Sequence, residues 1–297
     1  MRICSTLGYA ERIERAIALL ERKAAAGEPA SLSDLASAAA LSPYHFHRIF
    51  RVMTGESVGD AIVRARLGGA LPMLDRSIFD AVTQSGYATS QAFARAVKVR
   101  TDATPSELRN DPIRRKQAEE SLALPEQSGA ASPPITIKIT SVAPLRLAAI
   151  RNVGDYAELN HGFGQLVEQI VGKAGPEGIT GLYGIPYGDP RDVEPQYCRF
   201  DCAVSTSVSI DPDDQISIID CDGGPALEMT HCGDYDRIHD AVDALYRRAV
   251  REELQLSGAP LLIHYAQDPE EVPTDELFAN VYLWLEPAVE SKPLSVS

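Results

Sequence analysis

The stretch VGDYAELNHGFGQL (Val153–Leu166) returns 79 residues later as CGDYDRIHDAVDAL (Cys232–Leu245). Each copy follows a run of apolar, β-branched residues and opens a run with helical periodicity. Glycine accepts the positive φ of a sharp turn, and aspartate is a good helix N-cap, so both residues have structural work at this joint. The repeat therefore predicts a duplicated strand-to-helix joint rather than a catalytic signature that is used twice.

The elements around each copy are also repeated. The order strand–helix–strand–strand appears twice, and a further strand precedes each unit; the eight predicted strands are ITIKITSV, LRLAAIRNV, GLYGIPYGD, YCRFDCAVS, QISIID, ALEMTHC, LLIHYAQ and ANVYLWLE. We predict an α+β domain of two βαββ-type repeats at residues 135–288, with a flexible tail at 289–297.

The front of the chain is helical and contains a second repeat. Ser42 is a natural N-cap, Pro43 suits the first helical position, and an apolar stripe follows. The same design recurs at an offset of 47, and the paired positions are Phe46 with Phe93, Arg48 with Arg95, Phe50 with Val97, Arg51 with Lys98, Gly55 with Asp102 and Ser57 with Thr104. Two short helices joined by a tight turn form a helix-turn-helix, so residues 1–112 are predicted to be an all-α double helix-turn-helix domain.

Charge divides the chain at about the same place. The net charge of −14 is the sum of +5 for residues 1–116 and −19 for residues 117–297. Because an acidic surface repels a polyanion, any contact with double-stranded DNA is expected in the front part. A small, polar, Pro-bounded stretch predicts a linker at residues 113–134. Five cysteines without a paired framework, and no apolar run long enough for a membrane, favour a cytoplasmic protein.

The front part resembles the DNA-binding domain of AraC-type transcription regulators. The resemblance covers about residues 8–109 and rests on SPYHFHRIFR followed by TGE, and on TPSELR. It implies that two recognition helices read neighbouring segments of the major groove. The implied DNA-binding residues are Tyr44, His45, His47, Arg48, Arg51, Ser90, Gln91, Arg95 and Lys98. Arginine can pair with guanine and glutamine with adenine, whereas Arg51 and Lys98 are expected at phosphates.

Several residues depart from that pattern in the second unit. Val97 and Thr101 stand where aromatic residues are usual, and the helix that connects the two units contains Gly68, Gly69 and Pro72. Glycine and proline both weaken a helix interior. We therefore expect a kinked or shortened connecting helix and a less rigid second reader.

The back part resembles the GyrI-like effector-binding domain over roughly residues 135–288. The matching stretches are GLYGIPYGDPRDVEPQYCRFDCAV, HCGDYDRIHDAVDALYRRAV, SGAPLLIHYAQDPEEVP and NVYLWLEP. The resemblance implies a pseudo-twofold axis and a cleft for a small-molecule effector. Ile263 stands where the family usually has a glutamate, so a small, apolar or aromatic ligand is expected instead of a simple cation. The expected ligand-binding residues are Tyr156, Tyr183, Tyr187, Tyr235, Ile263, Tyr265 and Trp284.

The combined prediction is a ligand-responsive transcription regulator with no cofactor, no bound metal and no catalytic residues. One alternative is a GyrI-like hydrolase of small hydrophobic compounds, in which Glu194 or Glu228 replaces the missing acid. A second is a gyrase-binding or other protein-interaction module; either would carry a vestigial DNA-binding head. His45 and His47 diverge on a helix, and the cysteines suit core positions better than a metal or redox site. RNA polymerase is a possible further partner, and the chain could act as a monomer or a homodimer.

Overall fold

The computed structural model describes residues 8–123, 136–269 and 271–287. The chain divides into two compact units, residues 1–131 and 132–297, each of which is described by itself. The second half of the expected linker, residues 124–134, and the expected tail at 289–297 lie outside the described residues. Among those that are described, no helix is both long and apolar enough to cross a membrane.

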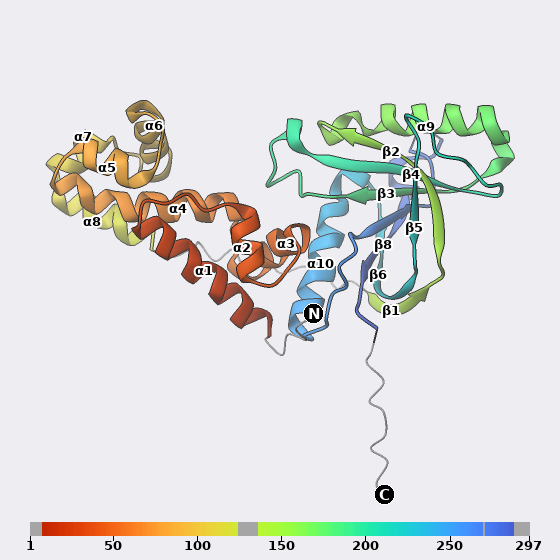
Figure 1. Cartoon of the computed structure of the whole chain (residues 1–297), viewed down its shortest axis with the longest axis horizontal. Coiled ribbons are helices and arrows are strands. Elements are labelled where there is room, and N and C mark those ends of the chain that lie inside the picture. The colour runs from red at the N-terminus through yellow and green to blue at the C-terminus, as the bar shows by residue number, and fades with distance from the viewer. Residues whose placement is uncertain (1–7, 124–135, 270, 288–297) are drawn as a thin grey trace, which may run out of the picture. The chain divides into compact units, whose positions relative to one another are not determined.

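The first unit is entirely helical (Figure 1). Its helices are α1 (Tyr9–Ala25), α2 (Leu32–Ala38), α3 (Pro43–Thr54), α4 (Val58–Ala70), the 3-10 segment η1 (Leu71–Asp75), α5 (Ile78–Ser85), α6 (Ser90–Thr101), α7 (Pro105–Asn110) and α8 (Pro112–Ser121). Helices α2 and α3 form the first helix-turn-helix, and α5 and α6 form the second. The all-α prediction for this part is confirmed.

Helices α3 and α6, the second helix of each helix-turn-helix, begin and end at positions that are 47 residues apart. Helices α3 and α6 each contain 12 residues, and the side chains of Ser42 and Thr89 cap them by accepting a backbone N–H three residues on. Each helix ends at a left-handed residue, Gly55 with φ 79° and Asp102 with φ 51°. The two helices are therefore built on one plan, although Asp102 adopts a conformation that glycine takes at lower cost.

The connecting helix α4 is shortened as expected. It ends at Ala70, and Pro72 lies in the 3-10 segment that follows. Gly69 lies against α1, because a Cβ atom there would come within 3.1 Å of the Ala24 carbonyl oxygen, whereas Gly68 has no neighbour within 4 Å of such an atom. Close packing of two helices explains one glycine of the pair, and the other leaves a weak point in α4.

Helix α8 occupies residues that composition assigns to the linker. Asp111 caps it by accepting from the backbone of Ile113 and Arg114. Ala118 and Leu122 are buried in one cluster with Phe93. The polar stretch is helical here because Ala118 and Leu122 share one face that covers the second helix-turn-helix, although Ile113 is exposed.

The second unit is an eight-stranded antiparallel sheet with two long helices (Figure 1). Its elements are β1 (Ile137–Val142), β2 (Leu145–Val153), α9 (Leu159–Ala174), β3 (Ile179–Pro186), β4 (Arg199–Thr206), β5 (Ser217–Cys221), β6 (Gly224–Cys232), α10 (Ile238–Arg251), β7 (Leu262–Tyr265) and β8 (Phe278–Trp284), with 3-10 turns at Tyr156–Glu158, Pro176–Gly178, Pro195–Tyr197, Tyr235–Arg237 and Thr274–Glu276. The α+β prediction of two βαββ-type repeats is confirmed.

The sheet has pseudo-twofold symmetry. Its strand order is β1-β6-β8-β7-β3-β4-β2-β5, which reads the same backwards when each strand is exchanged for its counterpart in the other repeat. Gly184 of β3 pairs directly with Ile263 of β7, and these two residues are themselves 79 apart. The axis therefore passes between them. Strands β1 and β5 each pair with the other repeat, because β1 lies beside β6 and β5 beside β2.

The two faces of the sheet have different surroundings. Leu166 and Ile170 of α9 pack on Phe200, Cys202 and their neighbours, and α10 packs on β6 and β8. We call this the helix face. Residues of opposite strand parity form a second apolar cluster, which includes Leu147, Tyr183 and Trp284. We call this the inner face, since the curled sheet brings its residues from both repeats together.

Candidate DNA-binding and small-molecule sites

The residues expected to bind DNA in the first unit lie on α3. With about 100° per residue, Tyr44, His47, Arg48 and Arg51 share one side of this helix. The opposite side carries the stripe of Phe46, Ile49 and Phe50, which are at most 1% exposed. His45 lies at the flank between the two sides. The apolar stripe holds α3 in its unit. On the rest of the helix His45, His47 and Arg48 are also buried, with exposed fractions of 2%, 4% and 5%, whereas Tyr44 and Arg51 are partly exposed.

Helix α6 repeats this arrangement with fewer polar groups. Gln91, Arg95 and Lys98 are exposed and share one side, while Phe93 and Val97 are completely buried on the other. Ser90 is the first residue of the helix. At the offset of 47 the counterpart of His47 is Ala94, so the second reader lacks one of the polar side chains of the first.

The helix face carries a row of aromatic rings across the pseudo-twofold axis. The row runs from Tyr235 to Tyr265 (5.0 Å between ring centroids), then to Phe163 (5.7 Å), Phe200 (6.3 Å) and Tyr156 (5.3 Å). Every pair meets edge to face, the arrangement that aromatic quadrupoles favour. Phe200 is buried, whereas the other four rings are partly exposed. We call these five residues the aromatic row.

The two tyrosines at the ends of the row anchor equivalent loops. The hydroxyl of Tyr156 donates to the carbonyl oxygens of Arg199 (3.2 Å) and Gly188 (3.5 Å). The hydroxyl of Tyr235 donates to those of Phe278 (2.9 Å) and Gln267 (3.1 Å). Each acceptor lies 79 residues from its counterpart, so both copies of the Gly-Asp-Tyr triplet make the same contacts.

The glycine and aspartate of each triplet behave as the sequence predicts. Gly154 has φ 152° and Gly233 has φ 94°. The side chains of Asp155 and Asp234 each accept a backbone N–H at the start of the following 3-10 turn. The joint is therefore structural at both copies.

Three of the expected ligand-binding residues do not reach the aromatic row. Tyr183, Tyr187 and Trp284 lie on the inner face. The structure thus separates the predicted set into two groups, because successive residues of a strand point to opposite faces. Tyr156, Tyr235, Ile263 and Tyr265 are the group that lies on the helix face.

Tyr187 is committed to a polar network on the inner face. Its hydroxyl donates to Asp201 (2.8 Å), which also accepts two bonds from Arg151 (2.7 and 2.8 Å). Burial, followed by the bond to Asp201, raises the pKa of Tyr187 to about 12. The tyrosine therefore stays neutral and hydrogen-bonded within this network at physiological pH.

Of the two acids that could replace the missing glutamate, neither is in the aromatic row. Glu228 lies on β6 and pairs with Lys138 at 3.2 Å, and its register partner on β8 is Tyr282 of the inner face. Glu194 is exposed in the loop before β4 and accepts from Gln196. Ile263 itself is 2% exposed beside the axis. The centre of the helix face is thus apolar and aromatic.

The cysteines occupy separate positions in the second unit. Cys202 lies beneath α9, and burial raises its pKa to about 12, so it remains a thiol. Cys198 is buried just before β4, and Cys232 is exposed at the end of β6. His231 is used locally, since its ring Nε2 meets the Asp234 carbonyl oxygen at 2.8 Å.

Comparison with known proteins agrees with this division. A family model described as a GyrI-like small molecule binding domain matches residues 135–286, more than half of the chain. The chain belongs to the GyrI-like family. A helix-turn-helix domain model matches residues 35–111. Its first unit is of the AraC type, since the chain is 33% identical to regulatory protein SoxS of Escherichia coli over 86 residues, 28% of this chain and 80% of that protein.

Two further similarities extend the comparison. The right origin-binding protein of Escherichia coli is 34% identical over 88 residues, which are 29% of this chain and 30% of that protein. The crystal structure of the EcmrR C-terminal domain is 14% identical with a TM-score of 0.43, over 51% of this chain and 98% of that one. By its two family matches, the chain joins a helix-turn-helix DNA-binding domain to a GyrI-like small-molecule domain.

In the GyrI-like domain, sequence reasoning missed two members of the aromatic row. Phe163 lies one turn into α9, within the repeated stretch, and Phe200 lies between two cysteines on β4. The signal available was strand parity, since Phe200 shares the face of Cys202. Tyr265 shares that face as well, and placing all three together requires the pairing of β3 with β7, which periodicity alone does not give.

Proposed function

We propose that this AraC-type, GyrI-like protein regulates transcription by binding duplex DNA through α3 and α6 and a small aromatic molecule through the aromatic row. The DNA-binding residues in this proposal are Tyr44, His45, His47, Arg48, Arg51, Ser90, Gln91, Arg95 and Lys98. The observation that carries it is the repeat of 47 residues, which reproduces the caps, the length and the polar side of α3 in α6. Two equivalent helices can enter neighbouring stretches of one major groove.

The first test removes one base-reading arginine. In the full chain, Arg48→Ala should weaken binding to a duplex selected from a random pool by about 10- to 100-fold, because one bidentate contact to guanine is lost. Wild-type binding should also weaken steeply as salt rises, since phosphate contacts release counterions. Affinity is measured by fluorescence anisotropy at several salt concentrations.

Arg22→Ala is the matched control, because Arg22 is an exposed arginine in the last turn of α1, outside both readers. It removes the same charge and should change affinity by less than about threefold. Equal losses in the two variants would show that α3 contributes only general charge, and the proposed reading would fail.

The ligand-binding part of the proposal rests on the partly exposed aromatic row. Rings that meet edge to face leave their remaining faces for a flat guest, and such guests gain from both burial and aromatic contact. Ile263 at the axis offers no charge, so a neutral aromatic molecule fits better than a cation. The strongly acidic composition of residues 117–297 acts at longer range and does not change this contact chemistry.

A neutral planar dye, N-phenyl-1-naphthylamine, tests the site, with ethidium as the planar cation for comparison. The full chain should bind the neutral dye more tightly, and saturating dye should raise its melting temperature. Phe163→Leu should weaken dye binding by about tenfold, because one ring of the row is lost. Binding is measured by dye fluorescence.

Tyr183→Leu is the control for position, since Tyr183 stacks on His264 on the inner face, 4.7 Å between centroids. It should leave dye affinity unchanged. If Tyr183→Leu weakened binding and Phe163→Leu did not, the ligand would lie on the inner face instead.

We propose that the GyrI-like domain binds its ligand without converting it. Among the described residues beside the aromatic row, Ile263 replaces the family's acid and burial raises the pKa of the Cys202 thiol, so neither of these two positions offers hydrolysis a base or a nucleophile. We further propose that the protein acts in the cytoplasm and contacts RNA polymerase from its operator. One chain carries two readers, so a monomer is sufficient for binding and a homodimer is not required.

A further inference from the structure

The connecting helix α4 must hold the two readers at a fixed separation, yet it contains a weak point. Gly68 and Gly69 lie near its C-terminal end, and a glycine pair lowers helix stability relative to alanine. Leu67 before this pair and Leu71 and Leu74 after it are completely buried in the cluster of the second reader. Bending at the glycines would therefore strain this cluster and shift the second reader relative to the first.

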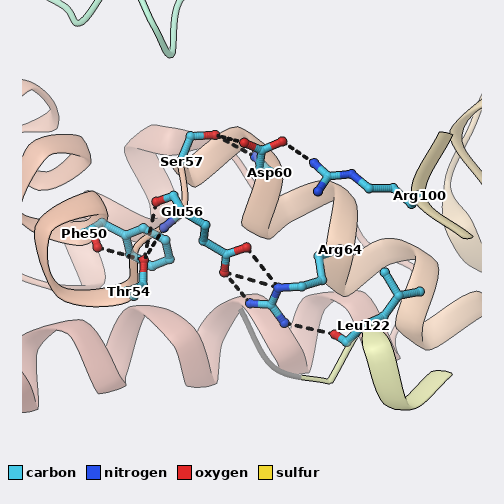
Figure 2. Close-up of polar contacts among 8 residues, drawn as sticks. All are labelled: Phe50, Thr54, Glu56, Ser57, Asp60, Arg64, Arg100 and Leu122. Carbon is cyan, nitrogen blue, oxygen red and sulfur yellow. Dashed lines mark hydrogen bonds and ion pairs between the residues drawn. The ribbon is translucent and has the colours of Figure 1, made fainter. Parts of the chain in front are cut away.

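Arg64 joins the two sides of this weak point. It lies on α4 before the glycines, and its Nε donates to both carboxylate oxygens of Glu56 (3.0 and 3.2 Å). Its Nη2 donates to the same carboxylate at 2.5 Å, and its Nη1 donates to the carbonyl oxygen of Leu122 at 3.2 Å. Figure 2 shows the guanidinium between these two groups.

Each end of this bridge belongs to a different reader. Glu56 follows α3 directly, and Thr54 fixes it by donating to the Phe50 carbonyl oxygen and accepting from the Glu56 backbone N–H. Leu122 lies at the end of α8 and is buried in the same cluster as Phe93 of α6. The contacts thus run from the last turn of α3, through Arg64, to the core of the second helix-turn-helix (Figure 2).

The bridge is protected from water. The side chains of Arg64 and Glu56 are 17% and 12% exposed, so the pair is screened less than a surface pair. A second, more exposed pair acts in the same direction, because Arg100 of α6 binds Asp60 of α4, whose other oxygen accepts from the Ser57 hydroxyl (Figure 2). Two contacts therefore link α4, before the glycines, to the second helix-turn-helix and its cover: the hydrogen bond from Arg64 to the Leu122 carbonyl oxygen and the ion pair of Asp60 with Arg100.

We propose that Arg64 is a positioning residue for DNA recognition, which braces the glycine-weakened connecting helix and so sets the spacing between the two half-sites that the chain accepts. This inference rests on the proposed binding of DNA by α3 and α6. The residue need not touch DNA itself. Its role is to convert a flexible pair of readers into one with a defined separation.

The test compares two duplexes within each variant of the full chain. One carries a site selected from a random pool, and the other carries that site with one base pair inserted between its halves. Wild type should lose about 100-fold in affinity on insertion, because only one half can then be read in register. Arg64→Gln should lose less than about tenfold, since its readers can adjust. A ratio within one variant is independent of its folded fraction.

Lys23→Gln is the matched control, because it breaks an ion pair of 2.8 Å with Asp34 that joins α1 to α2 and lies outside the bridge. It should keep the wild-type ratio. If Arg64→Gln does not fold by circular dichroism, Glu56→Gln provides the weakened bridge. A wild-type ratio in the folded bridge variant would overturn the inference, whereas failure of the wild type to bind any duplex would overturn the proposed function instead.

A second-site change locates the flexible point. Adding Gly68→Ala to Arg64→Gln should restore at least half of the lost discrimination on a logarithmic scale, because alanine stiffens α4 and has no neighbour there. Absence of any recovery would overturn the glycine pair as the place that Arg64 braces.

Discussion

At the scale of single residues, the tyrosine of each Gly-Asp-Tyr triplet closes a loop. Tyr156 and Tyr235 stand at the two ends of one aromatic row. Their hydroxyls hold the loops that precede β4 and β8. The triplet thus links the start of a helix to the hairpin that follows that helix.

Removing either hydroxyl should lower stability by a similar amount. Tyr156→Phe and Tyr235→Phe should each reduce the free energy of unfolding by about 1 kcal/mol, because partly buried carbonyl groups lose a donor. Urea unfolding of the full chain, monitored by circular dichroism, measures the change.

Tyr197→Phe is the control, since Tyr197 is 64% exposed in the same loop as one of the acceptors. It should change stability by less than about 0.5 kcal/mol. If the three variants were equally stable, the hydrogen bonds of the two tyrosine hydroxyls would contribute nothing to the free energy of unfolding.

Some roles of the candidate residues could be predicted from the sequence, and others could not, because strand alternation does not say which face of the sheet a helix covers. The roles of Gly154 and Asp155 follow from backbone preferences and were predicted. The faces of Tyr183 and Tyr265 were not, because period-two alternation separates two faces without saying which one the helices cover. That information comes from the pairing of β3 with β7.

At the scale of secondary-structure elements, the two adjacent glycines of α4 have different functions. Gly69 allows close contact with the C-terminal end of α1, and this contact is reinforced by the Gln84 side chain, which donates to the carbonyl oxygens of Ala24 (3.0 Å) and Ala25 (2.8 Å). Gly68 has open space around it. Packing against α1 requires a glycine at position 69, whereas position 68 has room for a larger residue.

Alanine substitutions at these two positions should therefore change the free energy of unfolding by different amounts. Gly68→Ala should raise the free energy of unfolding by about 0.5–1 kcal/mol, because alanine is the better helix former. The free energy of unfolding of Gly69→Ala should be at least about 1 kcal/mol lower than that of Gly68→Ala, since the new Cβ would press on the α1 backbone. Thermal unfolding of the full chain compares them, and equal stabilities would mean that α1 and α4 do not pack through Gly69.

The elements also show where sequence patterns succeed. Helix α3 was predicted from its cap Ser42 and from Pro43, and α6 from the repeat at an offset of 47; the structure adds Thr89 as the equivalent cap of α6. Helix α8 was assigned to the linker, although Asp111 and Pro112 are typical of a helix start. Its polar composition predicts a linker, because composition does not show that Ala118 and Leu122 pack together on the second helix-turn-helix.

At the scale of the whole molecule, charge is distributed unevenly along the chain. Residues 1–116 carry a net charge of +5 and residues 117–297 carry −19. The second unit therefore opposes the approach of DNA wherever it lies within a Debye length of the duplex. This repulsion acts on every sequence equally, so it lowers the affinity for specific and for random DNA by the same factor.

Removing the acidic part should expose this effect. A fragment that ends at Ala123 should bind random duplex DNA more tightly than the full chain at about 50 mM salt, and the difference should shrink to less than about twofold near 500 mM, where charges are screened. Anisotropy titrations at both salt concentrations measure it. A difference that persisted at high salt would indicate direct obstruction of the readers rather than charge.

The exchanged first strands of the GyrI-like domain have a consequence for its ancestry. Neither repeat completes its half of the sheet alone, because β1 lies beside β6 and β5 lies beside β2. Two copies of one repeat, each lending its first strand to the other, would build the same eight strands around a true twofold axis. The duplicated domain thus has the arrangement of a strand-exchanged dimer joined into one chain, and differences between its halves, such as Gly184 opposite Ile263, are asymmetries that two identical chains could not carry.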